Sequence, residues 1–210
     1  ISFTGSVSTG RKVAAACIAG NPMKKVQLEM GGKNPLVVLD DADLEKAVKT
    51  GVSARLNNAG QVCTAAKRFI LHEKIADAFL SKFTEAFKQV KIGDPLDEST
   101  TLGPLSSKDA LETLTRQVNE AVKNGATLHY GGKPAQRDGS FFEPTILTNI
   151  SRDNPAYFEE FFGPVGVVYR VAGEDEAGGA LADPVADLGA VGRASIEDED
   201  HERADGERGV

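Results

Sequence analysis

The chain has 210 residues, 40% of them hydrophobic and 26% charged, so it is long enough to bury a core and has ordinary globular composition. Its formal net charge of -7 argues against nucleic acid or an anionic membrane as the main partner. Two cysteines make no disulfide framework, and no apolar run is long enough to span a bilayer. We therefore expect a cytoplasmic protein that binds neither nucleic acid nor membrane.

Strand and helix patterns alternate along the chain, which predicts an α/β fold with a largely parallel sheet. In chain order the predicted elements are a helix at 9–19, strands at 26–30 and 36–39, a helix that starts at Asp41 or Asp43, helices at 73–91 and 107–123, and strands at 145–149 and 165–171. In the 73–91 segment apolar side chains recur every three or four residues, so this helix buries one face.

The amino-acid composition changes after residue 171. Residues 172–210 contain no aromatic side chain and hold 12 Asp and Glu against three Arg and no Lys. Such a segment has little apolar surface to bury, so we expect it to lack stable structure.

A glycine-rich turn at 5–10 nearly matches the phosphate loop of nucleotide triphosphatases. The match fails at both chemical positions, because Arg11 replaces the lysine and Lys12 replaces the hydroxyl residue. Two interpretations remain open, a helix start that binds a phosphate group and a plain helix start.

Cys63 lies in a small, polar segment, where a merely structural cysteine is unexpected. Backbone N–H groups of the following turn, and Lys67 and Arg68 if they point inward, would favour the thiolate that a nucleophile needs. Cys17, flanked by alanines, fits burial in a helix. Glu29 ends an apolar strand beside a Gly-Gly turn, where partial burial would suit a general base and exposure would leave a plain surface charge.

The three histidines are scattered, with no cysteine or carboxylate at ligand spacing, so we expect no metal site. A hydrolase that pairs Cys63 with His72 is compatible with the spacing, because such pairs meet only in the fold. No local signature supports it.

Four motifs together resemble the NAD(P)-dependent aldehyde dehydrogenase superfamily. They are Phe-Thr-Gly-Ser at 3–6, Leu-Glu-Met-Gly-Gly-Lys at 28–33, Gly-Gln-Val-Cys at 60–63 and Glu-Phe-Phe-Gly-Pro at 160–164. The resemblance extends over residues 1–171. Within the superfamily the chain is most similar to bacterial succinate-semialdehyde dehydrogenases, and residues 26–48 also resemble oxoglutarate-semialdehyde dehydrogenases.

The resemblance implies roles for individual residues. Cys63 would be the nucleophile, forming a thiohemiacetal with the aldehyde and then a thioester, and Glu29 would activate the water that hydrolyses the thioester. The cofactor, NAD or NADP, would be held by Ser6, Glu160 and Phe162, at the pyrophosphate, the nicotinamide ribose and the nicotinamide ring. The remaining residues of the implied cofactor site are Gly5, Gly10 and Met30.

The resemblance also implies a division of the chain and a larger whole. Residues 1–33 would be a remnant of the dinucleotide-binding domain, 34–171 most of the catalytic domain and 172–210 a diverged acidic tail. Family members extend further at both ends and form homo-oligomers, and this chain begins at Ile1 without an initiator Met, so we expect a fragment. The predicted function is NAD(P)-dependent oxidation of an aldehyde, with succinic semialdehyde preferred. The alternative is a truncated, non-catalytic remnant or interaction module of the same fold.

Overall fold

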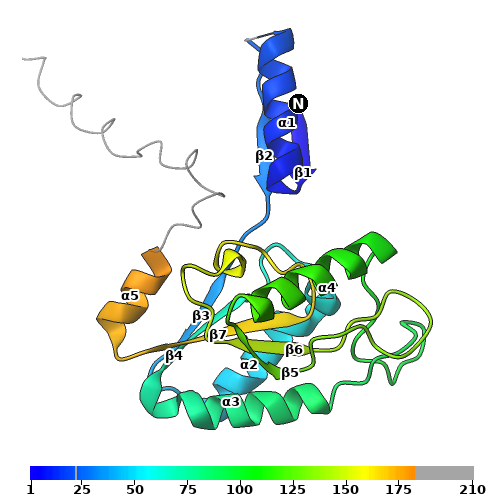
Figure 1. Cartoon of the computed structure of the whole chain (residues 1–210). Helices are drawn as coiled ribbons and strands as arrows, with labels where there is room; N and C mark the ends of the chain where they lie inside the picture. Colours follow the sequence, from blue (N-terminus) through cyan, green and yellow to red (C-terminus); the bar gives the residue numbers. More distant parts are fainter. Residues whose placement is uncertain (22, 183–210) are drawn as a thin grey trace, which may run out of the picture.

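The computed structural model describes residues 1–21 and 23–182, which form two units that each contain a parallel sheet. The smaller unit consists of β1 (Ser2–Gly5), α1 (Val7–Gly20) and β2 (Gln27–Met30). β1 and β2 pair in parallel with α1 as the crossover, so this unit is one βαβ motif. In Figure 1 it stands apart from the rest of the molecule, to which the residues after β2 connect it.

The larger unit is built on a five-stranded sheet in the order β3-β4-β7-β6-β5. The first four of these strands run parallel, whereas β5 pairs antiparallel with β6 at one edge. The strands are β3 (Pro35–Val38), β4 (Arg68–His72), β5 (Thr127–Tyr130), β6 (Thr145–Thr148) and β7 (Val165–Val171). The predicted α/β class with parallel sheets is therefore confirmed.

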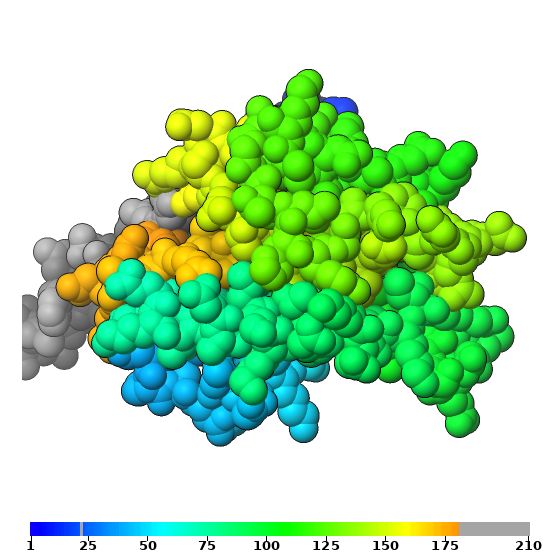
Figure 2. Space-filling view, turned by 60° about the horizontal axis from the view of Figure 1, so that its bottom comes forward, coloured from blue at the N-terminus to red at the C-terminus, as the bar shows by residue number. Residues whose placement is uncertain are grey.

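Helices cover both faces of the larger sheet (Figure 1). On one face α2 (Leu44–Leu56) and α3 (Glu73–Lys88) lie side by side, as the teal and blue surfaces of Figure 2 show. The other face carries α4 (Lys108–Lys123) and α5 (Glu174–Ala182). Two short 3-10 turns, η1 (Asn57–Gly60) and η2 (Pro155–Tyr157), lie in the segments that lead to the site described below.

The face under α2 and α3 holds an aromatic core. Its rings belong to Phe69 of β4 and to Phe79, Phe83 and Phe87 of α3. Phe83 lies at the centre, with ring centroids 4.8 Å from Phe69 and 4.4 Å from Phe87. Two glycines make room for Phe69, because a Cβ at Gly51 or Gly166 would lie 3.0 Å from its ring. The stripe predicted for this helix is thus core packing.

Two helix starts follow from capping residues in the sequence. The Asp43 carboxylate accepts a hydrogen bond from the Lys46 backbone N–H at 3.0 Å, and the Ser107 hydroxyl accepts one from Ala110 at 3.1 Å. Each satisfies a backbone donor that the first helical turn leaves without a partner. Of the two caps predicted for α2, the structure therefore selects Asp43.

The predicted lack of structure after residue 171 is wrong for its first part. Residues 174–182 form α5, which packs on β4 and β7 with Ala177 buried against Ile70 and Val171. The Arg68 guanidinium also donates to the Ala180 carbonyl at 2.8 Å. A few small apolar side chains and one backbone contact suffice to hold this helix, which a composition argument does not register. The rest of the predicted tail lies outside the described residues.

Among the described residues, no helix is both long and apolar enough to cross a membrane.

Candidate active site

Cys63 is carried on a turn that reverses the chain after α2. Asn58, Ala59 and Gly60 all have positive φ, at 51°, 53° and 74°. At Gly60 a Cβ would lie 2.2 Å from the Gly163 carbonyl oxygen, so only glycine fits. Left-handed backbone at Ala59 carries a cost of about 1 kcal/mol, which the surrounding contacts must offset. The turn leaves Cys63 exposed at the end of a rigid segment.

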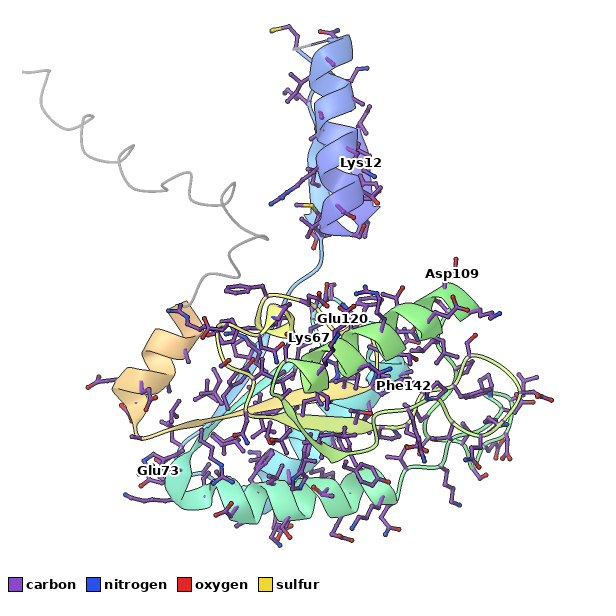
Figure 3. The ribbon with its side chains drawn as sticks, in the orientation of Figure 1. Lys12, Lys67, Glu73, Asp109, Glu120 and Phe142 are labelled. Atoms are coloured by element: carbon purple, nitrogen blue, oxygen red, sulfur yellow. The ribbon has the colours of Figure 1, made fainter. Side chains whose placement is uncertain are left out.

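Lys67 holds this turn from the inside. Its side chain is only 1% exposed, and its ammonium donates to the Val62 carbonyl at 3.0 Å and to the Cys63 carbonyl at 2.8 Å. Figure 3 shows Lys67 within the larger unit, near the point where the chain from β2 enters it. Of the two cations expected to point inward, Lys67 does so. Arg68 instead donates to the Lys33 and Ala180 carbonyls.

Glu160 faces the same interior from the segment before β7. Its carboxylate lies 2.9 Å from the Lys67 ammonium and its side chain is 18% exposed. The backbone of Gly31 lies against it, because a Cβ there would be 1.8 Å from Glu160 Oε2. Gln117 of α4 donates to the Glu160 carbonyl at 3.2 Å, which ties this segment to the helix above it.

The smaller unit contributes a helix start and a carboxylate. Ser6 caps α1, where its hydroxyl accepts a weak hydrogen bond from the Thr9 backbone N–H at 3.4 Å and donates to the Thr9 hydroxyl at 3.0 Å. The first turn of α1 contains no acidic residue, so the positive end of its dipole is not neutralised locally. Glu29, on β2, is exposed, in contrast to the partial burial that would suit a general base.

These groups line one cavity of about 740 Å³ between the two units. Of the residues that the resemblance implied, seven line it: Gly5, Ser6, Glu29, Met30, Cys63, Glu160 and Phe162. Phe162 presents its ring there with 47% of the residue exposed, whereas the neighbouring Phe161 is buried. The cavity therefore brings together a thiol, three carboxylates, a helix N-terminus and two aromatic rings.

Gly10 does not line the cavity. It is buried where α1 crosses β2, and a Cβ there would lie 2.6 Å from the Met30 sulfur. Gly10 therefore lets the helix pack closely on the strand, which is a packing role in place of the expected contact with a cofactor.

His72 does not meet Cys63. It caps α3 at the far end of β4, so the five residues of that strand, at about 3.3 Å each, separate it from the cysteine end. The hydrolase alternative therefore has no geometric support. Within the described residues no group of three or more His, Cys, Asp and Glu side chains is arranged to hold a metal ion.

Sequence reasoning missed several residues of the cavity. Arg116 and Gln117 come from α4 and Phe158 from the segment after η2, none of them in a motif. The helical periodicity of α4 marks which residues are buried but carries no information on what its exposed face meets. The burial of Lys67 and Arg55 beneath the cysteine turn was also unforeseen, since both look like surface cations in the sequence.

Comparison with known proteins gives a consistent result. Residues 1–183 match the aldehyde dehydrogenase family. Succinate-semialdehyde dehydrogenase [NADP(+)] of Mycolicibacterium paratuberculosis is 50% identical over 175 residues, which cover 83% of this chain and 37% of that protein. The corresponding protein of Deinococcus radiodurans is 47% identical, over 84% of this chain and 37% of that protein.

Solved structures extend the likeness to the fold. The structure of Gox0499, described as giving insight into cofactor and substrate selection, is 53% identical with a TM-score of 0.79 and covers 84% of this chain and 38% of that one. Betaine aldehyde dehydrogenase from Staphylococcus aureus, solved in complex with NAD+, is 37% identical with a TM-score of 0.80, over 84% of this chain and 35% of that one. The chain thus spans little more than a third of the length of the relatives it matches. With the family matched over nearly nine tenths of its residues, the chain belongs to the aldehyde dehydrogenase family.

Proposed function

We propose that this chain carries the reactive centre of an NAD(P)-dependent aldehyde dehydrogenase that oxidises succinic semialdehyde to the carboxylate. The observation that carries the proposal is the cavity in which the exposed Cys63 thiol, the Glu29 carboxylate and the capped start of α1 meet. The substrate is proposed from relatives at 45–50% identity that are named succinate-semialdehyde dehydrogenase [NADP(+)]. Their names also favour NADP over NAD.

The chemistry divides between the two protein groups. The Cys63 thiolate adds to the aldehyde carbon and forms a thiohemiacetal, which is a far better hydride donor than the free aldehyde. Loss of hydride leaves a thioester on Cys63. Glu29 then accepts a proton from water as the water attacks the thioester, which releases the carboxylate and regenerates the thiolate. Exposure of Glu29 to the cavity gives it access to that water.

The residues around the cavity fit a nicotinamide dinucleotide. The start of α1, with Ser6 as cap and no acid in its first turn, suits a pyrophosphate. The Glu160 carboxylate can accept hydrogen bonds from ribose hydroxyls, and the exposed Phe162 ring offers an apolar surface to a nicotinamide. When bound, the dinucleotide supplies the hydride acceptor.

The proposal is tested best in a complete enzyme. The chain would replace the aligned segment of the Mycolicibacterium paratuberculosis relative, and NADPH formation from succinic semialdehyde would be followed by absorbance. We expect turnover that Cys63→Ser abolishes and that Cys17→Ala, the matched change at the other cysteine, leaves close to the parent value. A chimera that is folded but inactive, or one that turns over without Cys63, would contradict the proposal.

The role of Glu29 has its own kinetic signature. In the same chimera Glu29→Gln should slow thioester hydrolysis by about 10²-fold to 10⁴-fold while acylation continues, which gives a burst of NADPH followed by a slow steady state. Equal loss in both phases would assign Glu29 to positioning instead. The 210-residue chain alone should show little turnover, because the resemblance places the adenosine-binding residues in a segment that the 210 residues do not include.

A further inference from the structure

The Lys67 ammonium contacts both the turn that carries Cys63 and the carboxylate of Glu160. Four acceptors lie within 3.5 Å of this ammonium: the Val62 carbonyl at 3.0 Å, the Cys63 carbonyl at 2.8 Å, the Ala65 carbonyl at 3.5 Å and Glu160 Oε1 at 2.9 Å. Three of the acceptors are backbone carbonyls of the segment that carries Cys63, and the fourth belongs to the segment before β7. One buried cation therefore spans both parts of the cavity wall.

Because Lys67 is buried, its ammonium needs these contacts to offset the loss of water. Burial lowers the pKa of Lys67, while the hydrogen bond and the charge of Glu160 act in the opposite direction and retain the ammonium form. A buried ammonium that lost Glu160 would be left with neutral carbonyls, and the partly buried Glu160 carboxylate would lose its ion pair at 2.9 Å if Lys67 were removed. The two groups therefore stabilise each other in one arrangement.

Contacts on two sides limit where the Glu160 carboxylate can lie. Lys67 pairs with Oε1 at 2.9 Å, and the backbone of Gly31 lies against Oε2. The Arg55 guanidinium lies near enough to interact with Glu160 electrostatically, but it donates to the Gly60 carbonyl at 2.5 Å. A movement of Glu160 is thus felt first at Lys67, and through Lys67 at the carbonyl of Cys63.

We propose that Lys67 is a positioning residue that couples the conformation of the Cys63 turn to the position of the Glu160 carboxylate, so that nucleophile and ribose-binding group are set together. The assignment of roles to Cys63 and Glu160 rests on the proposed function. The coupling itself is a property of these contacts and can be measured without turnover.

The test follows the alkylation rate of Cys63 in the 210-residue chain, with Cys17→Ala to remove the second thiol. Lys67→Ala should slow alkylation by iodoacetamide about tenfold at fixed pH, because a charge-assisted contact to the Cys63 carbonyl and a cation beside the thiolate are lost. Lys74→Ala is the control. It removes another ammonium that pairs with a carboxylate, that of Asp40 at 2.8 Å, at the far end of β4, and should leave the rate unchanged.

Chemical rescue separates positioning from a general loss of structure. n-Propylammonium replaces the atoms that Lys67→Ala removes, and it should restore most of the rate, whereas 1-propanol, of equal size without charge, should not. Lys67→Arg provides a second route, since it retains a cation at the site. A folded Lys67→Ala chain with the parent rate, or equal rescue by propanol, would overturn the proposal. If Lys67→Ala does not fold, Lys67→Arg should fold and retain the rate within about threefold, and a larger loss would overturn it.

The coupling requires a double-mutant cycle. Glu160→Gln should change the Cys63 alkylation rate when Lys67 is present and have no effect in the Lys67→Ala background. An equal effect in both backgrounds would show that Glu160 acts independently of Lys67. If the chimera kept turnover without Cys63, the proposed function would fail while the cycle would still report the coupling, so the two outcomes remain distinguishable.

Discussion

The two units differ in how they are held together, although both supply residues to the same cavity. The larger unit has an aromatic core centred on Phe83, with helices on both faces of its sheet. Within the described part of residues 1–30 only Gly10 and Cys17 are buried, while Ile18 and Met23 are largely exposed. Burial of apolar surface is the main stabilising contribution to folding. Cys63 and Glu160 therefore rest on the well-supported unit, and Ser6 and Glu29 on the one with fewer contacts.

The largest expected contrast is between core positions of the two units. Phe83→Ala should lower the free energy of unfolding by about 3–5 kcal/mol, since it empties the centre of the aromatic cluster. Ile18→Ala, at a position that is 60% exposed, should change it by less than about 0.5 kcal/mol. Urea denaturation followed by circular dichroism measures both. A cost at Ile18 equal to that at Phe83 would mean that the smaller unit is packed in solution.

A single methyl group added to the turn that leads to Cys63 should lower the free energy of unfolding. Gly60→Ala forces a Cβ to within 2.2 Å of the Gly163 carbonyl oxygen at positive φ, so we expect destabilisation of about 3 kcal/mol. Gly125→Ala is the matched control, because Gly125 also has positive φ but its Cβ would meet nothing within 4 Å. The control should cost about 1 kcal/mol from backbone strain alone. If urea denaturation gave the same loss in free energy of unfolding for both variants, the close contact with Gly163 would not be the cause.

Lys33, in the segment that joins the units, should give stability a pH dependence. Its pKa is lowered to about 8, first by burial and second by the Arg68 guanidinium, with Glu159 and Glu160 acting in the opposite direction. Because this value lies below the 10.5 of the exposed side chain, the unfolded chain binds more protons between pH 8 and 10.5. Stability should rise across that window, on the order of 2 kcal/mol.

Lys33→Met isolates this contribution. The variant should lose the rise between pH 8 and 10.5 while retaining the dependence at lower pH that the carboxylates produce. The difference between the two pH profiles, measured by thermal unfolding, therefore reports Lys33 alone. Parallel profiles would show that the Lys33 ammonium is not desolvated.

The smallest expected effect is a difference in alkylation rate between the two cysteines, one of which lies in each unit. Cys63 is exposed and Cys17 is 5% exposed within α1, so alkylation followed by peptide mass mapping should label Cys63 at least about tenfold faster. Low urea should then accelerate labelling of Cys17 before the larger unit unfolds, because regions with few buried contacts open at lower cost. Preferential labelling of Cys17 in buffer would contradict the assignment of Cys63 as nucleophile. Simultaneous exposure of both regions in urea would mean that the units unfold together.

Much of the fold follows from local signals, and the misses have physical reasons. The caps at Asp43 and Ser107 and the apolar stripe of α3 place their helices within a few residues. β4 was not predicted, because its five residues, four of them buried, directly follow the polar segment around Cys63 and continue into α3 without a turn signal. β1 was hidden for a similar reason, since its four residues read as part of a glycine-rich turn.

The sequence points to the residues of the candidate site that lie in motifs, and misses those whose place depends on which side chains the fold brings together. Cys63, Glu29 and Glu160 stand out in the sequence and share one cavity. Whether Lys67 or Arg68 points inward depends on the direction of the chain as it enters β4, which sequence spacing does not report. Gly10 shows the reverse case. It stands out in the sequence as part of a turn that resembles a phosphate loop, but in the structure it allows α1 to pack on β2.

The contact between Gly31 and Glu160 places the connection between the two units directly against a carboxylate of the cavity. Gly31 lies in the segment that connects the two units, and its backbone forms the wall against Glu160 Oε2. Any rotation of the smaller unit about this segment shifts that wall, and so alters how much of the carboxylate faces the cavity. The connection between the units and the Glu160 carboxylate thus occupy the same few ångströms, and a side chain at position 31 would alter both the path of the connection and the access to the carboxylate.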